Sequence, residues 1–231
     1  MKKKFKIQWC KKCVLPNTRP NLIIHKSGLC SICSLKKKKD INWKARFKLL
    51  KNLVKEIKKK SKNNYDCIVP ISGGKDSYWQ ILNALKLGLK PLAVTWKPSG
   101  RNKLGDINLK NLINLGIDHI DYTINPKVES AMLLKALKEF GSIGVPMHLS
   151  IFNITYKLAN LFNVHLVIWG ENPSSEYGYK DISETNKNPD HNYFMNHNIV
   201  KNTKLNFWKS KNISDKDLNG YYFFPKKNKK I

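Results

Sequence analysis

The chain has 231 residues, which is enough for one α/β domain with a buried core and a small accessory module. No stretch approaches the roughly 18 apolar residues that span a bilayer, and no apolar segment follows the N-terminal lysines. The sequence therefore predicts neither a membrane span nor a secretory signal, and we expect a cytoplasmic protein.

The charge is strongly positive, since 43 Lys and Arg residues stand against 16 Asp and Glu residues and give +27. Such a charge is typical of proteins that bind polyanions, nucleic acid among them. Arginine, whose planar fork matches phosphate best, occurs only at Arg19, Arg46 and Arg101. Lys and Asn have AT-rich codons, so genome composition explains the excess of lysine as well as function does. Nucleic acid therefore stays an alternative partner and not the main prediction.

Residues 1–40 are predicted to form a zinc-ribbon module. Two C-x-x-C pairs are separated by sixteen residues, namely Cys10, Cys13, Cys30 and Cys33. This spacing is typical of a closed four-thiolate zinc site with a structural role, and a segment so short of apolar residues needs a metal to fold. Disulfides and an iron–sulfur cluster are the alternatives. The fifth cysteine, Cys67, is interpreted as a small buried hydrophobe.

Residues 41–62 read as a linking amphipathic helix. Lysines fill one face, and large apolar residues recur on the other at helical spacing. The residues expected to face inward are Trp43, Phe47, Leu50, Val54 and Ile57.

Between residues 63 and 180, predicted strands alternate with predicted helices. The strands are expected at 67–71, 92–96, 119–124 and 165–169, and the helices at about 77–88, 107–115, 127–140 and 146–162. This alternation predicts a parallel sheet covered on both faces, with ligands bound beyond the carboxyl ends of the strands. Residues 181–231 lose the pattern and are expected to be weakly structured or truncated.

The loop between the first strand and the next helix carries the strongest motif of the chain, S-G-G-K-D-S, made of Ser72, Gly73, Gly74, Lys75, Asp76 and Ser77. Glycines let a phosphate approach the backbone, and the following helix presents free N–H groups. Lys75 can place a charge on a phosphate, and Asp76 can hold Mg²⁺ or cap the helix. The spacing G-x-x-x-x-G-K-[ST] is absent, so this is not the kinase-type nucleotide loop.

A second motif follows the fourth predicted strand. Glu171, Asn172 and Glu176 stand on the expected ligand edge. Glu171 could bind Mg²⁺ or transfer a proton, and Asn172 and Glu176 could bind substrate hydroxyl or amide groups. A surface turn is the alternative. Trp96, at the end of the second strand, either stacks near an adenine or packs in the core. His119 and His148 are interpreted as packing or surface residues.

Five motifs in order, over about residues 8–180, together resemble one family. They are C-x-x-C-V-L-P, G-L-C-x-x-C, S-G-G-K-D-S, P-L-A-V-T-W and W-G-E-N-P-x-x-E-Y-G. The loop is similar to that of the PP-loop ATP pyrophosphatase superfamily, which has the Rossmann-like fold of adenine nucleotide alpha hydrolases. The full set resembles the N-acetyl sugar amidotransferase family of O-antigen lipopolysaccharide and pseudaminic- or legionaminic-type sugar synthesis. Members of that family usually continue well past the end of this chain.

The resemblance implies an enzyme that splits ATP, with Mg²⁺, between the α and β phosphates. ATP adenylates the acetamido carbonyl of a nucleotide-activated N-acetyl sugar, and ammonia then displaces AMP to leave an acetamidino group. Ammonia comes from a glutaminase subunit through a cyclase-like subunit. The residues that the resemblance assigns to ATP are 72–77, those to zinc are the paired cysteines, and those to the site are Glu171, Asn172 and Glu176.

Two other functions remain open. A PP-loop enzyme that modifies tRNA, by thiolation or amidation, would explain the positive charge and the cysteine pairs. Thiolation relies on a reactive thiolate or a cluster near ATP, and no cysteine follows Cys67. A non-enzymatic zinc-ribbon binding module beside an inactive nucleotide domain is the other alternative, although the intact S-G-G-K-D-S motif argues against it.

Overall fold

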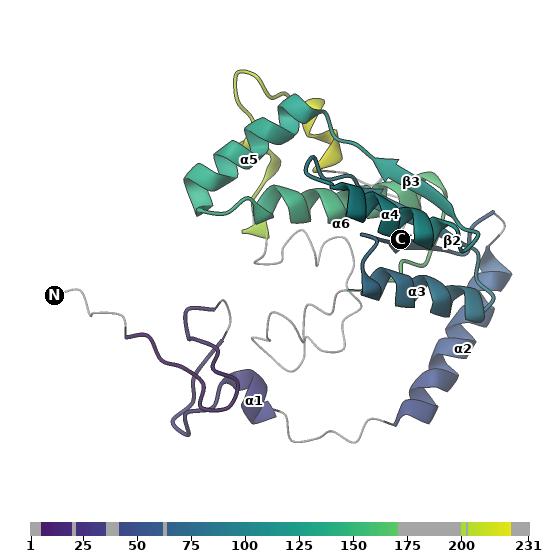
Figure 1. The fold of residues 1–231 in the computed structure, drawn as a ribbon, viewed down its shortest axis with the longest axis horizontal. Coiled ribbons are helices and arrows are strands. Elements are labelled where there is room, and N and C mark those ends of the chain that lie inside the picture. Colours follow the sequence, from purple (N-terminus) through teal and green to yellow (C-terminus); the bar gives the residue numbers. More distant parts are fainter. Residues whose placement is uncertain are drawn as a thin grey trace. The chain divides into compact units, whose positions relative to one another are not determined.

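The computed structural model describes residues 6–19, 22–35, 42–61, 64–170, 200–201 and 203–222. The chain forms two compact units. One comprises Met1–Phe47 with Glu171–Asn188, and the other comprises Lys48–Gly170 with Pro189–Ile231. The second unit contains the sheet and the helices from Lys75 onward (Figure 1).

A parallel sheet forms the centre of the larger unit. β1 (Cys67–Pro70), β2 (Pro91–Trp96) and β3 (Asp118–Tyr122) pair in the order β1-β2-β3, with Val69 opposite Ala93. Because all three strands run in the same direction, their carboxyl ends lie at one edge of the sheet. The predicted α/β fold with a parallel sheet is confirmed.

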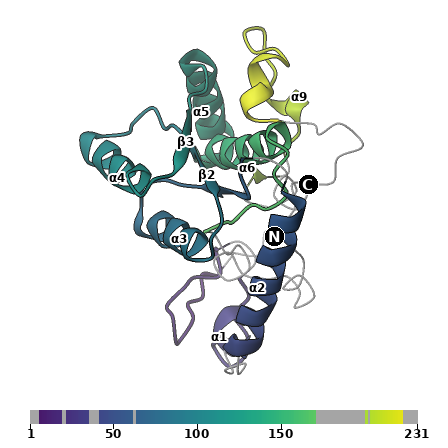
Figure 2. The same cartoon turned by 90° about the vertical axis from the view of Figure 1, so that its right-hand side faces the viewer.

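Helices cover both faces of this sheet (Figure 2). α3 (Lys75–Lys86) and α4 (Lys103–Ile113) contribute to the core on one face. α5 (Pro126–Phe140) and α6 (Gly144–Leu161) contribute to the core on the other. Successive strand residues alternate between the two cores, which is the period of two that a pleated strand imposes. Ile68 belongs to the core with α5 and α6, while its neighbours Cys67 and Val69 belong to the core with α3 and α4.

The fourth predicted strand is reduced to one short contact in the structure. Residues 165–169 run parallel to β1, and Val167 forms an isolated bridge to Ile68. The Ile68 N–H donates to the Leu166 carbonyl at 2.9 Å, and the Ile168 N–H donates to the Ile68 carbonyl at 2.9 Å. The segment therefore occupies the expected position beside β1, although it is too short to extend the ladder.

The predicted linking helix is α2 (Trp43–Lys60), but its buried face is shorter than the sequence suggests. Val54 and Ile57 are buried, and Val54 joins the core with α3 and α4. Trp43, Phe47 and Leu50 are exposed, so the prediction that these three face inward is wrong. The apolar spacing is helical throughout α2, but spacing alone does not say how much of a helix has a partner.

The end of the chain contributes more to the fold than its sequence suggests. α9 (Leu205–Trp208) and the short 3-10 helix η3 (Asp217–Gly220) belong to residues expected to be weakly structured. Six of their apolar side chains and those of their neighbours are buried in the core with α5 and α6, namely Val200, Trp208, Ile213, Leu218, Tyr221 and Tyr222. For these residues the structure differs from the expectation, because the core contacts are made by single residues without a repeating pattern.

The described part of the N-terminal unit has a very small core. It holds two isolated bridges, Trp9 to Pro16 and Ile24 to Cys30, and the helix α1 (Ser31–Leu35). The buried apolar side chains of this described part are Cys10, Leu22 and Cys30. So few buried groups stabilise a fold only with an added cross-link or metal.

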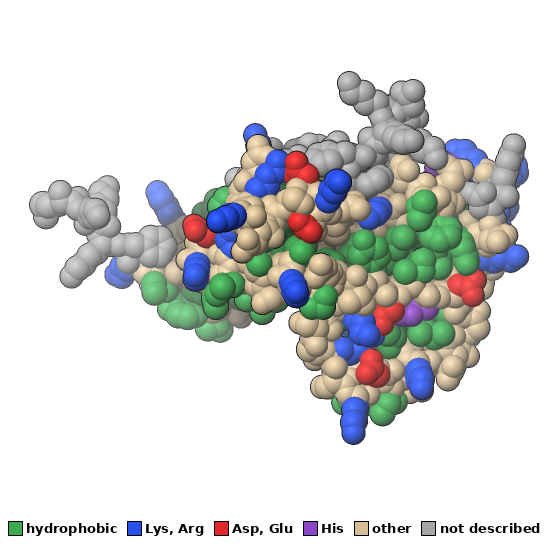
Figure 3. Space-filling view, turned by 90° about the horizontal axis from the view of Figure 1, so that it is seen from above, with side chains coloured by type: hydrophobic (Ala, Val, Ile, Leu, Met, Phe, Trp, Pro, Cys, Tyr) green, Lys and Arg blue, Asp and Glu red, His purple; other side chains and the backbone are tan. Residues whose placement is uncertain are grey.

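The distribution of positive charge and the apolarity of the helices concern possible binding to polyanions and to membranes. Lys and Arg side chains are scattered over the face drawn in Figure 3 and do not merge into one continuous patch. Within the described part of the chain, no helix has the length and apolarity needed to cross a membrane.

Candidate active site

The loop of residues 72–77 joins β1 to α3 at the carboxyl edge of the sheet. α3 begins at Lys75, and its N-cap is Gly74, which offers no side-chain cap. In contrast, the N-termini of α4 and α5 are capped by the side chains of Asn102 and Asn125. The first N–H groups of a helix have no intrahelical acceptor and form the positive end of its dipole. The start of α3 is therefore open to an anion.

Gly73 is the position in this loop that must be glycine. Its φ angle is +81°, in the left-handed region that side chains disfavour. A Cβ atom on Gly73 would lie 3.1 Å from the Leu109 backbone nitrogen and 3.3 Å from its Cα. The loop thus packs directly on the backbone of α4, which leaves its outer side for a ligand.

Ser72 and Ser77 hold the loop in shape. The Ser72 N–H donates to Ser77 Oγ at 2.9 Å, and the Gly74 N–H donates to Ser72 Oγ at 3.4 Å. Ser77 is buried, so its hydroxyl belongs first to the loop itself. The predicted hydroxyl contacts of both serines to a phosphate stay predictions.

Lys75 and Asp76 form an exposed ion pair at the start of α3. Lys75 Nζ lies 2.7 Å from Asp76 Oδ1 and 2.9 Å from Oδ2, and the two side chains are 87% and 74% exposed. Exposed pairs of this kind contribute little stability, so either partner can exchange its contact for a phosphate or a cation at small cost. The carboxylate is held by Lys75, and α3 is left without a side-chain cap.

Of the remaining residues predicted to bind ATP or substrate, the structure describes Trp96 only. Trp96 is half-buried and packs against the core with α5 and α6, which favours the core-packing alternative. Its indole Nε1 is buried and has no hydrogen-bond partner in the described part of the chain. Glu171, Asn172 and Glu176 lie outside the described residues, and their roles stay predictions.

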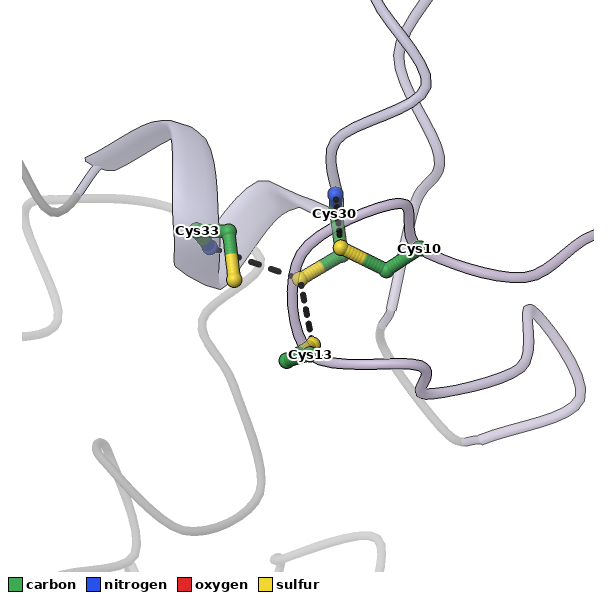
Figure 4. Close-up of side chains that lie close together, drawn as sticks. All are labelled: Cys10, Cys13, Cys30 and Cys33. Atoms are coloured by element: carbon green, nitrogen blue, oxygen red, sulfur yellow. Dashed lines mark hydrogen bonds between the residues drawn. The ribbon is translucent and has the colours of Figure 1, made fainter.

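The four paired cysteines converge on one point in the N-terminal unit (Figure 4). All four Sγ atoms lie within 4.8 Å of one another, and Cys13 Sγ is 3.6 Å from Cys30 Sγ. Tetrahedral zinc with Zn–S bonds of about 2.3 Å requires sulfur atoms roughly 3.8 Å apart, so the thiols fit such an ion. The four residues come from a knuckle at 10–13 and from the start of α1, as the sequence spacing predicts.

Backbone N–H groups also point at these sulfur atoms. The N–H groups of Lys12 and Cys30 donate to Cys10 Sγ at 3.4 and 3.2 Å. Burial alone would raise the pKa of Cys10, but these backbone hydrogen bonds and that of Cys13 outweigh it and lower the pKa to about 6. A thiolate stabilised in this way is a good metal ligand.

We expect about one zinc ion per chain, because the four thiols suit a closed four-coordinate site and no other described Cys, His, Asp or Glu joins their cluster. Elemental analysis of the purified protein measures this ratio directly. Cys13→Ser should lower the zinc content, whereas Cys67→Ala should leave it unchanged, since Cys67 lies in β1. Iron in place of zinc, or loss of the metal in both variants, would contradict the assignment.

Cys67 is fully buried in β1, in agreement with its interpretation as a small hydrophobe. Burial, with a smaller effect from Asp66, raises the pKa of its thiol to about 12. A thiol in this environment stays protonated and is a poor nucleophile.

One group of polar residues near the loop was not predicted from the sequence. Arg101, His119 and Asp121 line a pocket of about 570 Å³ between α4 and β3. These residues stand far apart in the chain and belong to no recognisable motif. The nearest sequence signal is the alternation of His119 and Asp121 along β3, which puts both side chains on the face toward α4.

No protein-family model matches the chain, and no curated protein matches it. Solved structures do match. NMN synthetase from Francisella tularensis is 22% identical, with a TM-score of 0.44, over 58% of this chain and 56% of that one. NH3-dependent NAD synthetase from Campylobacter jejuni is 18% identical, with a TM-score of 0.45, over 70% of this chain and 77% of that one.

A third similar structure is described as a predicted subunit of a tRNA methyltransferase from Methanocaldococcus jannaschii. It is 21% identical, with a TM-score of 0.37, over 51% of this chain and 58% of that one. The alignments thus span little more than half of the NMN synthetase and of the methyltransferase subunit.

Proposed function

We propose that this protein is an ATP-dependent, AMP-forming amidotransferase that acts on a nucleotide-activated N-acetyl sugar. The observation that carries the ATP part is the loop 72–77. It follows a buried strand, opens an uncapped helix, and is pressed against α4 at Gly73. This arrangement offers backbone N–H groups to a phosphate without side chains in the way.

The proposed reaction has two steps. First, the acetamido carbonyl oxygen attacks the α-phosphorus of ATP, so that an O–P bond forms and pyrophosphate leaves. Second, ammonia attacks the activated carbon, the C–O bond breaks, and the former carbonyl oxygen leaves with AMP. The amidino group is left in its protonated, cationic form, because amidines are strong bases.

The roles of the residues follow from their positions. The backbone N–H groups at the start of α3 would hold phosphate oxygens, and Lys75 would exchange Asp76 for a phosphate. Asp76 would hold Mg²⁺, which neutralises phosphate charge. We propose Glu171, Asn172 and Glu176 as substrate residues on their sequence positions, with Glu171 also catalytic, and a glutaminase with a cyclase-like subunit as the source of ammonia.

The alternative is an enzyme that modifies tRNA. The net charge of +27 and the basic N-terminal module favour a polyanionic substrate. Thiolation is disfavoured, because Cys67 is buried with a raised pKa and the other four cysteines converge on a candidate metal site. An RNA-directed amidation remains the second candidate.

Phosphorus NMR of ATP–Mg²⁺ with the protein and ammonium separates these two functions. One arm contains UDP- and CMP-linked N-acetyl sugars, and the other contains bulk tRNA. AMP and pyrophosphate that form only with the sugars would support the proposal. The same products with tRNA alone would move the assignment to RNA modification, and ADP with phosphate in either arm would overturn AMP formation itself.

A further inference from the structure

The pocket between α4 and β3 has the size and the mixed lining of a small-molecule site. Its volume of about 570 Å³ lies within the range of known ligand pockets. It combines apolar side chains of α4 with charged and polar side chains from α4, β3 and the segment before α4. The residues that line it include Ile107, Ile113, Lys103, Lys110, Arg101 and His119.

Hydrogen bonds and ion pairs fix the Arg101 side chain on one side of the pocket. The Arg101 guanidinium donates two hydrogen bonds to Asp121, at 2.6 and 2.7 Å, and lies 3.6 Å from Asp106. Its side chain is only 10% exposed. The hydrogen bonds to Asp121 raise the pKa of Arg101. Burial would raise the pKa of Asp121, but the guanidinium lowers it, so both groups stay charged. The pair builds one side of the pocket without leaving a net charge.

His119 is fixed by a chain of two hydrogen bonds. Thr95 Oγ1 donates to the Ile71 carbonyl at 2.9 Å, so its oxygen must accept the bond from His119 Nε2 at 2.9 Å. The Nε2 atom therefore carries a proton. Burial lowers the pKa of His119, which makes the neutral ring the main form at neutral pH. Its Nδ1 atom is then an acceptor, and no described residue hydrogen-bonds to it. A ligand with an N–H or O–H group would satisfy it.

The free positive charge comes from two lysines of α4. Lys103 and Lys110 line the pocket, and no carboxylate of the described residues lies within ion-pair distance of either ammonium group. The three cations and two carboxylates of the lining leave an excess of positive charge at these lysines. An anionic group, such as a phosphate, fits this part of the pocket.

The pocket is also close to the loop of residues 72–77, the proposed phosphate loop. Leu109, in its wall, is the residue whose backbone Gly73 contacts, and the hydrogen-bond chain from His119 ends on Ile71, next to Ser72. One helix, α4, thus supports both the loop and the pocket. A molecule in the pocket would lie within about a helix diameter of a nucleotide at the loop.

We propose that the pocket between α4 and β3 binds a small phosphorylated molecule that carries an amide or hydroxyl donor. Lys103 and Lys110 contact its phosphate, His119 Nδ1 accepts from its donor, and Ile107 and Ile113 contact its apolar part. That this molecule is the acceptor substrate rests on the proposed function, whereas the binding itself does not.

Calorimetric titration of the full chain, loaded with zinc, tests the site. The probe is N-acetylglucosamine 1-phosphate, which has both features, and the comparison ligands are glucose 1-phosphate and N-acetylglucosamine, which each lack one. We expect the double variant Lys103→Gln/Lys110→Gln to bind the probe about tenfold more weakly. The matched control, Lys127→Gln/Lys138→Gln in α5, removes the same charge and should bind normally. The imidazole NMR signals of His119, assigned with His119→Gln, should shift on binding.

Three outcomes would overturn the site: no binding at millimolar concentration, equal weakening in both double variants, or competition by ATP–Mg²⁺, which would place the probe at the phosphate loop. The two proposals fail separately. Binding in the pocket without AMP formation from any sugar would reject the proposed function alone. Amidation of a sugar by a protein that does not bind the probe would reject the pocket alone. An unchanged KM in Lys103→Gln/Lys110→Gln would reject only the assignment of the bound molecule as the acceptor substrate.

Discussion

Replacing Asp76 with asparagine is expected to slow the formation of AMP and pyrophosphate by about 10²-fold at a fixed Mg²⁺ concentration. The amide is a weaker cation ligand than the carboxylate and cannot neutralise its charge. Stability should change by less than about 0.5 kcal/mol, because Asp76 is largely exposed and its partner Lys75 is exposed as well. The measurement is the initial rate as a function of Mg²⁺, together with a thermal unfolding curve.

Asp215→Asn supplies the control for this experiment. Asp215 is also an exposed carboxylate paired with a lysine, since Lys209 Nζ lies 2.7 Å from its Oδ1. The change in charge and the loss of an ion pair are therefore the same, but Asp215 is not at the loop. An unchanged rate in Asp76→Asn, or an equal loss in both variants, would remove Asp76 from the proposed site.

The parts of this fold that could be predicted from the sequence are those set by short-range chemistry. The loop 72–77 follows directly from its glycines between an apolar strand and a helix, and the structure places it between β1 and α3. The cysteine cluster is predicted by the spacing of two C-x-x-C pairs, which is typical of a four-thiolate metal site, and the structure brings the four sulfur atoms together. In both cases, a short sequence motif identifies the residues that come together.

The parts that could not be predicted depend on contacts between distant segments. The pocket joins Arg101, α4 and β3 only after the sheet has formed, and no single stretch of sequence contains its pattern. The exposed Trp43 and Phe47 of α2 show the reverse case. Their helical spacing is real, but a periodic pattern reports a face that could be buried and not whether a partner covers it.

The end of the chain is the clearest example of a core contribution without a pattern. Asn and Lys dominate this region, so its few large apolar residues are easily missed in the sequence. Trp208 is nevertheless fully buried. Its ring lies 4.9 Å from that of Phe207 and 6.3 Å from that of Phe140 in α5, both in edge-to-face geometry. Such pairs add to the stabilisation that burial of the rings provides.

Trp208→Ala should therefore destabilise the protein by about 3–5 kcal/mol, the usual loss for a large aromatic side chain removed from a core. Urea unfolding followed by circular dichroism measures this change, and the midpoint should fall while the slope stays constant. Trp79→Ala is the matched control, since Trp79 in α3 is 65% exposed and its loss should change stability by less than about 0.5 kcal/mol. If both variants unfolded at the wild-type midpoint, residues 205–208 would not be part of the core. If Trp208→Ala alone is destabilised, residues 205–208 stabilise the domain through their packing in the core with α5 and α6.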